Sequence, residues 1–328
     1  MYDIDIVLAS YNGDKFITEQ IQSIQACSGY QALVRKIIVV DDGSTDNTIA
    51  ILQHLAAQDS KIELHAPSLD PNVVAHKGAS QNFQFGLTLT SAPYIMLCDQ
   101  DDVWLPEKLE SLLHKAKQAE KHSNTTTPIL VFSDKQIVDE QLNLICDSYF
   151  VLKQISKQWH KRFEQLIQQN VASGCTMLFN RALLERAMPI PSNAYMHDWW
   201  LALIASRCGV ISLIDKPLIQ YRQHQNNTIG AKQRSKMDLV LQFPSQLKAF
   251  QRSLNQVIMQ AQAFQQFEKQ HRLMSNDTIS ALSNLPTMTR LERLIAYKQG
   301  LITRSNRAGK IALVLSLLLM KRAGKGKR

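Results

Sequence analysis

The first hundred residues alternate short aliphatic runs with segments of helical periodicity, and this alternation limits the fold more than any other feature. Helices are expected near residues 14–26 and 80–90, and between them a helix that carries Ile49, Leu52 and Leu55, where apolar residues recur every three or four positions. Between them we expect strands at Ile4–Ala9, Lys36–Val40, Ile62–His65 and Tyr94–Cys98. The run Ile37–Val40 is wholly β-branched, as in parallel strands buried on both faces. The order predicts an α/β fold, with a mostly parallel sheet and helices on both faces.

The pattern changes along the rest of the chain. After Pro106 we expect a helix at 107–121, strands at 129–133, 175–180 and 210–214, and a tryptophan-rich helix at 197–208. From about Ala231 only helical periodicity remains, with one apolar stripe through Leu247, Phe250, Leu254, Val257, Ala261 and Phe264. We therefore predict an α/β domain over residues 1–230 and an all-α extension over 231–328.

Cysteine usage and charge exclude several classes of protein. The five cysteines are scattered and never form a CxxC pair, which argues against a disulfide framework or a zinc cluster and fits a reducing compartment. The N-terminus MYDIDIVLASYN has neither a basic region nor a long apolar run, so no secretory signal is expected. The net charge is +9, but residues 293–328 contain ten Lys or Arg and no acid. Residues 1–292 are therefore nearly neutral, which excludes a broadly basic surface for nucleic acid.

Three acids surround a glutamine directly after the fourth expected strand, in LCDQDDVW (97–104). Because side chains alternate along an extended chain, Asp99 and Asp101 point the same way. Two such carboxylates suit Mg²⁺ or Mn²⁺, which completes its shell with water and phosphate oxygens. The alternative is a solvated acidic turn that caps the helix beginning near Pro106. The apolar strand before it and the VWLP after it favour the metal.

Two further polar segments follow the first and second strands. Asp41-Asp42-Gly43-Ser44 combines acids that can accept hydrogen bonds from a base or ribose with a helix N-terminus that favours anions, although an ordinary turn and cap is the alternative. Ser10-Tyr11-Asn12-Gly13 offers a ring for a flat base, although Asn-Gly alone is also a routine turn. All three segments lie at the carboxyl ends of strands, where ligands of open α/β sheets bind.

Read as an ordered set, IVLASYNGDKF, IIVVDDGSTDNT and IMLCDQDDVWLPEKL resemble the family 2 glycosyltransferases of the A-type fold. The segment ASQNFQFGL, before DQDDVW, is similar in particular to bacterial rhamnosyltransferases that build polysaccharide side chains. The resemblance covers about residues 3–230, and the ordered set is specific although each motif alone is weak. It implies a glycosyltransferase A-type nucleotide-binding sheet and a nucleoside-diphosphate sugar as donor.

The resemblance implies roles for individual residues of the donor site. Tyr11 would stack against the base, Asp42 would bond the imide edge of the base, and Asp99 would lie near the ribose or the metal. Many members have Thr or Pro where this chain has Ala9, which removes one polar contact to the nucleotide. The implied donor-binding residues are Ser10, Tyr11, Asn12, Asp42, Gly43, Asn82, Asp99, Gln100 and Arg222.

The resemblance also implies a metal site. Asp101 would be the principal ligand, with Asp99 beside it, and His224 would complete the shell. A neutral imidazole suits Mn²⁺ better than Mg²⁺, and a plain surface histidine is the alternative. Arg222 would contact the diphosphate, since a guanidinium pairs bidentately with phosphate.

The catalytic base of the family is an acid at the start of a later helix. The matching stretch is Met196-His197-Asp198-Trp199-Trp200, with His197 where Glu is more usual. Asp198 is the candidate base, because an acceptor hydroxyl needs a positioned group to take its proton, and a simple helix cap is the alternative. Ser173-Gly174 matches a glycine-containing acceptor loop. The expected acceptor-binding residues are Gly174, His197 and Trp199.

The tail carries an apolar run, IALVLSLLLM (311–320), with basic residues on both sides. As a helix, these residues span about 15 Å, about half of the hydrocarbon core, so a transmembrane helix is not expected. We expect a segment in the membrane interface, held to anionic lipid by its basic flanks, with a helix docked on the catalytic domain as the alternative. This predicts a cytoplasmic enzyme that is peripheral on the inner face of the cytoplasmic membrane, bound through residues 293–328.

These observations predict an inverting, divalent-metal-dependent transfer of a sugar to a cell-surface polysaccharide or a lipid-linked saccharide. The sub-family resemblance implies rhamnose from a thymidine diphosphate donor. One alternative is a phosphate-handling metal-dependent hydrolase, which would leave Tyr11 and Asp42 idle. Another is a catalytically dead relative that acts as a membrane scaffold in polysaccharide assembly. A dinucleotide-dependent oxidoreductase is disfavoured, because no GxGxxG follows the first strand.

Overall fold

The structure of the protein is a computed structural model that describes residues 3–70, 73, 75, 78–124, 126–224 and 243–323. The chain divides into two compact units. The first comprises Met1–Lys153, Ala172–Ile190 and Met196–Gly230. The second comprises Gln154–Val171, Pro191–Tyr195 and Ala231–Arg328.

One mixed sheet organises the first unit. Over the described part of the chain it has nine strands in the order β3-β2-β1-β4-β8-β6-β9-β5, with β7 paired to β6. The strands are β1 (Ile4–Ser10), β2 (Val34–Asp41), β3 (Ile62–His65), β4 (Tyr94–Cys98), β5 (Val103–Trp104), β6 (Ile129–Val138), β7 (Leu144–Cys146), β8 (Met177–Asn180) and β9 (Val210–Arg222).

Only the first half of the sheet is parallel throughout. Strands β1 to β4 pair in parallel, as the alternating sequence predicted. Strand β8 runs antiparallel to both β4 and β6, whereas β6 and β9 are parallel to each other. The α/β fold class is therefore confirmed, but the expectation of a mostly parallel sheet is correct only for this half. The reversal is local, because β8 enters the sheet from a short turn and not through a crossover helix of the kind that makes neighbours parallel.

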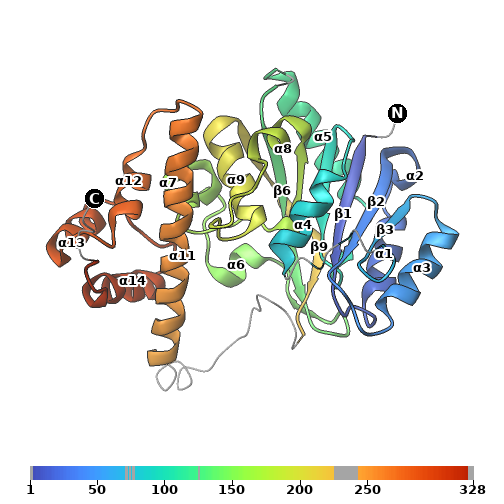
Figure 1. Cartoon of the computed structure of the whole chain (residues 1–328), viewed down its shortest axis with the longest axis horizontal. Coiled ribbons are helices and arrows are strands. Elements are labelled where there is room, and N and C mark those ends of the chain that lie inside the picture. Colours follow the sequence, from blue (N-terminus) through green and yellow to red (C-terminus); the bar gives the residue numbers. More distant parts are fainter. Residues whose placement is uncertain are drawn as a thin grey trace. The chain divides into compact units, whose positions relative to one another are not determined.

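Helices cover both faces of this sheet. Their bounds are α1 (Ile17–Gln25), α2 (Tyr30–Leu33), α3 (Thr48–Gln58), α4 (Ala79–Thr88), α5 (Lys108–Lys121), α6 (Tyr149–Lys153), α8 (Arg181–Ala187) and α9 (His197–Cys208). Ile6 and Leu8 of β1 pack in one buried cluster with residues of α1 and α5. On the opposite face Val7 meets α4 at Gly86, where a Cβ would lie 2.4 Å from the valine methyl. Helix α4 contacts β1 and β2, and in Figure 1 it lies in front of the sheet.

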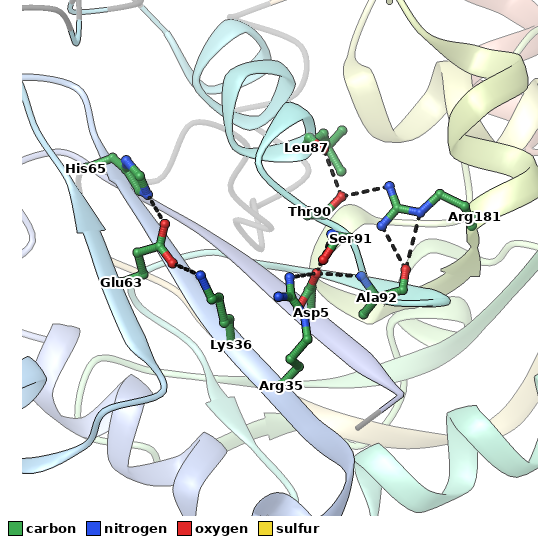
Figure 2. A network of polar contacts seen from close by, with 10 residues as sticks. All are labelled: Asp5, Arg35, Lys36, Glu63, His65, Leu87, Thr90, Ser91, Ala92 and Arg181. Carbon is green, nitrogen blue, oxygen red and sulfur yellow. Dashed lines mark hydrogen bonds and ion pairs between the residues drawn. The ribbon is translucent and has the colours of Figure 1, made fainter. Parts of the chain in front are cut away.

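A buried ionic network fixes the end of the sheet where β1 begins (Figure 2). Asp5 is fully buried and accepts a bidentate pair from Arg35, at 2.8 and 2.6 Å. It also accepts from the backbone N–H groups of Ser91 and Ala92, at 2.7 and 2.8 Å. Arg181 then donates to the carbonyl oxygen of Ala92. These bonds hold the connection between α4 and β4, and so set the start of the strand that leads to the acidic segment.

The second unit is helical, as predicted for the C-terminal extension. It contains the 3-10 helix η1 (Trp159–Lys161) and the helices α7 (Phe163–Leu166), α11 (Phe243–Gln270), α12 (Asp277–Asn284), α13 (Arg290–Lys298) and α14 (Arg307–Leu319). Its core includes Phe264, whose ring lies 5.1 Å from Phe163 and 5.3 Å from Phe267. The residues 231–242 and 324–328 of the predicted extension lie outside the described part of the chain.

The second unit also includes two segments that come before residue 231. Gln154–Val171 and Pro191–Tyr195 precede it in the sequence but belong to the second unit. The contact between Phe163 and Phe264 and the hydrogen bond from Asn276 Nδ2 to Glu164 Oε1 (3.1 Å) join the earlier segments to the later helices. The chain therefore enters the second unit twice before residue 231, which hydrophobic periodicity along the sequence does not reveal.

The basic tail is partly built into this unit. Arg293 is buried and donates to the carbonyl oxygens of Leu317 (3.2 Å) and Met320 (2.5 Å), where α14 ends. Arg304 is also buried and donates to the carbonyl oxygen of Gln168 at 2.6 Å. Two of the ten basic residues in the predicted membrane-binding segment therefore stabilise the fold. Among the helices that the structure describes, none combines the length and the hydrophobicity needed to cross a bilayer.

Candidate active site

Three loops meet at the carboxyl ends of β1, β2 and β4. The first link is a hydrogen bond of 2.8 Å from Ser10 Oγ, at the end of β1, to Asp41 Oδ2, at the end of β2. Asp41 also accepts from the backbone N–H groups of Gly43 (3.0 Å) and Ser44 (2.7 Å). Gly43 has φ +88°, a backbone conformation that favours glycine. Both Ser10 and Asp41 are buried, so this pair braces the two loops from below.

The two residues after Ser10 differ in how far they are exposed to solvent and in what they contact. The amide of Asn12 is used within the protein: its Oδ1 accepts from Thr45 N at 2.9 Å, and its backbone N–H donates to Ser44 Oγ at 2.8 Å. The side chain of Tyr11 is 55% exposed, a high value for an aromatic residue. On the β2 loop, Asp42 is half-buried and accepts from the backbone N–H of Gly78 at 2.7 Å. An exposed ring on one loop and a carboxylate on the neighbouring loop suit a planar, hydrogen-bonding ligand.

Gln100 fixes the backbone of Tyr11. Its Oε1 accepts from Tyr11 N at 2.8 Å, and its Nε2 donates to Tyr11 O at 3.0 Å. The amide passes directly over Gly13, where a Cβ would lie 2.3 Å from Gln100 Oε1. Glycine is needed here for close approach, not for an unusual φ. Gln100 was predicted to contact the donor, and in the structure both ends of its amide bind the loop that carries the exposed ring.

Asn82 was also predicted as a donor contact, and its side chain is buried beneath the site. It lies on α4 and donates from Nδ2 to the carbonyl oxygen of Val40 at 2.8 Å. Its Oδ1 has no hydrogen-bond partner among the described residues. The contact with Val40 lies directly before Asp41 and Asp42, so Asn82 supports the β2 loop.

The acidic segment after β4 meets a histidine from the far end of the unit. His224 Nε2 lies 2.7 Å from Asp101 Oδ2, although 123 positions separate the two residues. The imidazole also lies 5.0 Å from the ring of Phe16. The structure thus brings together two of the three predicted metal ligands. A carboxylate and an imidazole form a donor pair suited to Mn²⁺.

The third predicted ligand, Asp99, is grouped differently. One ligand atom from each of Asp99, Asp102 and Cys175 lies within 4.8 Å of the others. Burial and the charge of Asp101 raise the pKa of Asp99 to about 7, and burial raises the pKa of the Cys175 thiol well above its usual value. A neutral thiol is a poor ligand for a hard cation, so the carboxylates are the relevant donors. Crowded carboxylates with raised pKa values are what a divalent cation stabilises in their charged form.

Asp102 is more deeply placed than a helix cap. It is buried, and its Oδ1 accepts from the backbone N–H of Arg222 at 3.2 Å. Its Oδ2 has no hydrogen-bond partner among the described residues, and burial together with Asp101 and Asp99 raises its pKa. From the sequence, Asp102 was expected to be no more than part of a solvated turn that caps the following helix.

Arg222 is surrounded by protein acceptors. It is 3% exposed, and its guanidinium donates to the carbonyl oxygens of Asp101 (2.8 Å) and Glu140 (2.6 Å) and to the carboxylate of Glu19. The same group lies 4.6 Å from the ring of Phe16. This geometry favours a role in holding the Asp101 loop over the predicted direct contact with a diphosphate.

The candidate base lies at the first turn of α9. Asp198 is half-buried, and its carboxylate accepts from the backbone N–H groups of Gly174 (3.0 Å) and Trp199 (2.6 Å). The other two predicted acceptor contacts are turned inward. His197 is buried and stacks on Phe83 at 4.3 Å, and the side chain of Trp199 is also buried. Of the three predicted acceptor contacts, Gly174 bonds the candidate base Asp198, and a Cβ on Gly174 would lie 3.4 Å from Nε2 of the buried His197.

Two buried lysines near this point were not predicted. Lys135 on β6 donates to Ser173 Oγ at 3.0 Å, and Lys108 on α5 donates to the carbonyl oxygen of Cys175 at 2.6 Å. Burial lowers the pKa of Lys108 to about 8. It also lowers that of Lys135, but nearby ionisable groups, including Asp102 and Asp99, raise it by more. The available signal was a lysine within the strand-like run VFSDKQIV.

Comparison with known proteins decides the family. The model of the family described as "Glycosyl transferase family 2" matches residues 5–187, more than half of the chain. The chain belongs to glycosyl transferase family 2. This confirms the resemblance carried by its three motifs, and the protein is a glycosyltransferase.

Several bacterial proteins and solved structures are similar to this chain. A dTDP-rhamnosyl transferase, RfbG of Shigella flexneri, is 29% identical over 240 residues, which are 68% of this chain and 74% of RfbG. The uncharacterized glycosyltransferase alr2836 of a Nostoc species is 25% identical over 240 residues, covering 70% and 67% of the two chains. Among solved structures, residues 1–349 of S. aureus TarS, in complex with UDP-GlcNAc, match with a TM-score of 0.55 at 13% identity, covering 96% of this chain and 90% of that one. This likeness confirms the glycosyltransferase A-type fold.

Proposed function

We propose that this family 2 glycosyltransferase is an inverting enzyme that depends on a divalent cation and uses a nucleoside-diphosphate sugar. The observation that carries the proposal is the contact between Asp101 and His224 at the strand ends, where Gln100 also holds the loop that carries the exposed ring of Tyr11. Asp101, His224 and Asp99 would hold Mn²⁺ or Mg²⁺. The cation supplies Lewis-acid stabilisation of the negative charge on the departing diphosphate.

The transfer follows a single displacement. The acceptor hydroxyl gives its proton to the carboxylate of Asp198 as its oxygen bonds to the anomeric carbon. The bond from that carbon to the diphosphate oxygen breaks on the opposite face, and its electron pair leaves with the nucleoside diphosphate. The N–H groups of Gly174 and Trp199 hold the carboxylate in one orientation, so the base is in place before the acceptor arrives.

The donor rests on the loops of β1 and β2. Tyr11 stacks on the base, and Asp42 accepts a hydrogen bond from its imide edge. The likeness to RfbG supports a thymidine diphosphate donor carrying rhamnose. The acceptor is a saccharide or lipid-linked saccharide of a growing cell-surface polysaccharide.

A donor panel tests this proposal. Thermal shift and nucleoside diphosphate release are measured for thymidine, uridine and guanosine diphosphate sugars, with Mn²⁺, Mg²⁺ or chelator. Chelator and Asp101→Ala are each expected to abolish cation-dependent donor binding, whereas Asp198→Asn binds donor and does not transfer. Donor binding that chelator leaves intact would exclude the cation, and Asp198→Asn with normal turnover would exclude the base. Release of free sugar without acceptor, at the rate of transfer, would point to a hydrolase.

We further propose that the C-terminal helices bind the inner face of the cytoplasmic membrane. The described helices α13 and α14 leave four aliphatic side chains exposed: Leu291, Ile295, Ile311 and Leu319. The same segment also has exposed basic side chains, at Arg290, Lys298, Arg307, Lys310, Lys321 and Arg322. Aliphatic side chains among cationic ones suit a membrane of anionic lipid, where each Lys or Arg near the surface contributes about 1 kcal/mol to the binding free energy. The role of Arg293 in the fold removes it from this surface.

Liposome flotation tests the membrane proposal. The full chain is expected to bind vesicles of phosphatidylglycerol and phosphatidylcholine and not vesicles of phosphatidylcholine alone. Ile311→Gln with Leu319→Gln should weaken binding at least tenfold, since burying an aliphatic side chain contributes about 1.5–3 kcal/mol. Met274→Gln is the control, because Met274 is 85% exposed but lies outside α13 and α14. Equal binding by the double variant and by the control would rule out this surface.

A further inference from the structure

Two lysines reach the same short turn from different elements of the first unit. The turn is η2 (Gly174–Thr176), which directly follows Ser173 and leads into β8. Lys135 Nζ, from β6, donates to Ser173 Oγ at 3.0 Å. Lys108 Nζ, from α5, donates to the carbonyl oxygen of Cys175 at 2.6 Å. The turn is therefore held on both sides by long side chains that cross the interior.

Both lysines are almost completely buried, Lys108 at 0% and Lys135 at 6% exposure. Removing an ammonium from water is costly unless it is paired, yet neither forms an ion pair with a described residue. Aromatic rings supply part of the compensation: Lys108 Nζ lies 3.7 Å from the ring centre of Trp104, and Lys135 Nζ lies 3.8 Å from that of Tyr221. The hydrogen bonds to the turn supply the rest of this compensation, and they also fix the direction of each ammonium group.

The turn connects these lysines to the candidate base. The backbone N–H of Gly174 donates to Asp198 Oδ2 at 3.0 Å. The turn itself is closed by Thr176, whose Oγ1 and backbone N both donate to the carbonyl oxygen of Ser173, at 2.7 and 2.9 Å. A movement of Ser173 therefore displaces the Gly174 N–H and changes the direction of the carboxylate.

We propose that Lys135 is a positioning residue for sugar transfer, which fixes Ser173 and thereby the Gly174 N–H that orients Asp198. The inference rests on Asp198 as the base of the proposed function. Lys135 is the more informative of the two lysines, because its partner is a side chain that can be removed. The contact of Lys108 is to a carbonyl oxygen, which no substitution of the turn removes.

The test compares Lys135→Met, Ser173→Ala, the double variant and Lys135→Arg in the full chain, with Asp198→Asn as the reference variant for the base. Methionine keeps an unbranched side chain of similar length beside the tyrosine ring and removes the charge and its donors. Transfer is measured with dTDP-rhamnose as donor and with membranes isolated from the cell that makes the protein as the source of saccharide acceptor. Binding of thymidine diphosphate in the presence of Mn²⁺ is measured by calorimetry. Melting temperatures verify that each variant is folded.

We expect both single variants to lower kcat at least tenfold, because small misplacement of a reacting group has large effects on rate. The double variant should lose no more than the worse single variant, since both act through one contact. Lys135→Arg should recover part of kcat, and the Kd of thymidine diphosphate should change less than twofold throughout.

Three results would overturn the inference. If Lys135→Met weakens thymidine diphosphate binding and Ser173→Ala does not, Lys135 contacts the donor instead. If both single variants keep the wild-type kcat while Asp198→Asn does not turn over, Asp198 remains the base but Lys135 does not position it. If Asp198→Asn keeps normal turnover, the base in the proposed function fails, and this inference fails with it.

Discussion

Replacing Gln100 by alanine should weaken donor binding and leave the transfer step nearly unchanged. The substitution removes the two hydrogen bonds that hold the Tyr11 backbone, at 2.8 and 3.0 Å. Each bond contributes about 0.5–1.5 kcal/mol, so the loop loses about 1–3 kcal/mol of its preference for the observed conformation. A donor that binds only this conformation then binds about 5- to 150-fold more weakly. Steady-state kinetics should show this as a higher donor KM at similar kcat.

Gly13 provides a second route to the same change. A Cβ on residue 13 would lie 2.3 Å from Gln100 Oε1, so Gly13→Ala should displace the amide and raise the donor KM. Combining Gly13→Ala with Gln100→Ala should be no worse than Gln100→Ala alone, because the displaced group is gone. A donor KM for Gln100→Ala within twofold of the wild-type value would refute the reasoning, and so would a fall in kcat as large as the rise in KM.

Two further predictions concern stability. Asp5→Ala leaves Arg35 and two backbone N–H groups without their acceptor. This should lower the free energy of unfolding by about 3 kcal/mol and the melting temperature by at least about 6 °C. The control is Lys36→Ala, which removes the more exposed ion pair to Glu63 in Figure 2 and should change stability by less than about 1 kcal/mol. Burial lowers the pKa of His197 below 6.5, so the unfolded chain binds a proton that the folded chain does not, and stability falls as pH drops through this range. His197→Gln should flatten the decline in melting temperature between pH 7 and 5, and an unchanged slope would argue against this cause.

The order of strands and helices along the sequence was sufficient to predict the parallel half of the sheet and the loops that follow β1, β2 and β4. Strand β4 and the acids after it are neighbours in sequence, and their direction follows from the strand itself. The same holds for the loops of β1 and β2, because parallel strands bring their carboxyl ends to one edge. The contact between Ser10 and Asp41 is a direct result of this register, in which these two residues are partners.

Roles that depend on distant packing could not be predicted in this way. Arg222 was expected to face phosphate, but Glu19 lies 203 positions away and nothing local indicates that they meet. His197 was expected to face the acceptor, and only the packing of α4 shows that Phe83 covers its ring. Lys135 was overlooked because a lysine in a strand normally points to solvent, whereas here α6 contacts its strand and the rings of Tyr149 and Tyr221 lie against its ammonium group.

The long final strand of the first unit has a consequence for how the enzyme is made. The groups that reach Asp101 and Glu19 lie at the end of β9, at Arg222 and His224. A ribosome therefore synthesises every residue up to 224 before the proposed cation site has all of its side chains. The earlier strands can fold as they emerge, but the acidic segment stays without its arginine and its histidine until β9 pairs with β6. A nascent or truncated chain ending before residue 210 is thus expected not to bind or use sugar nucleotides. The order of the strands alone prevents premature activity in this way.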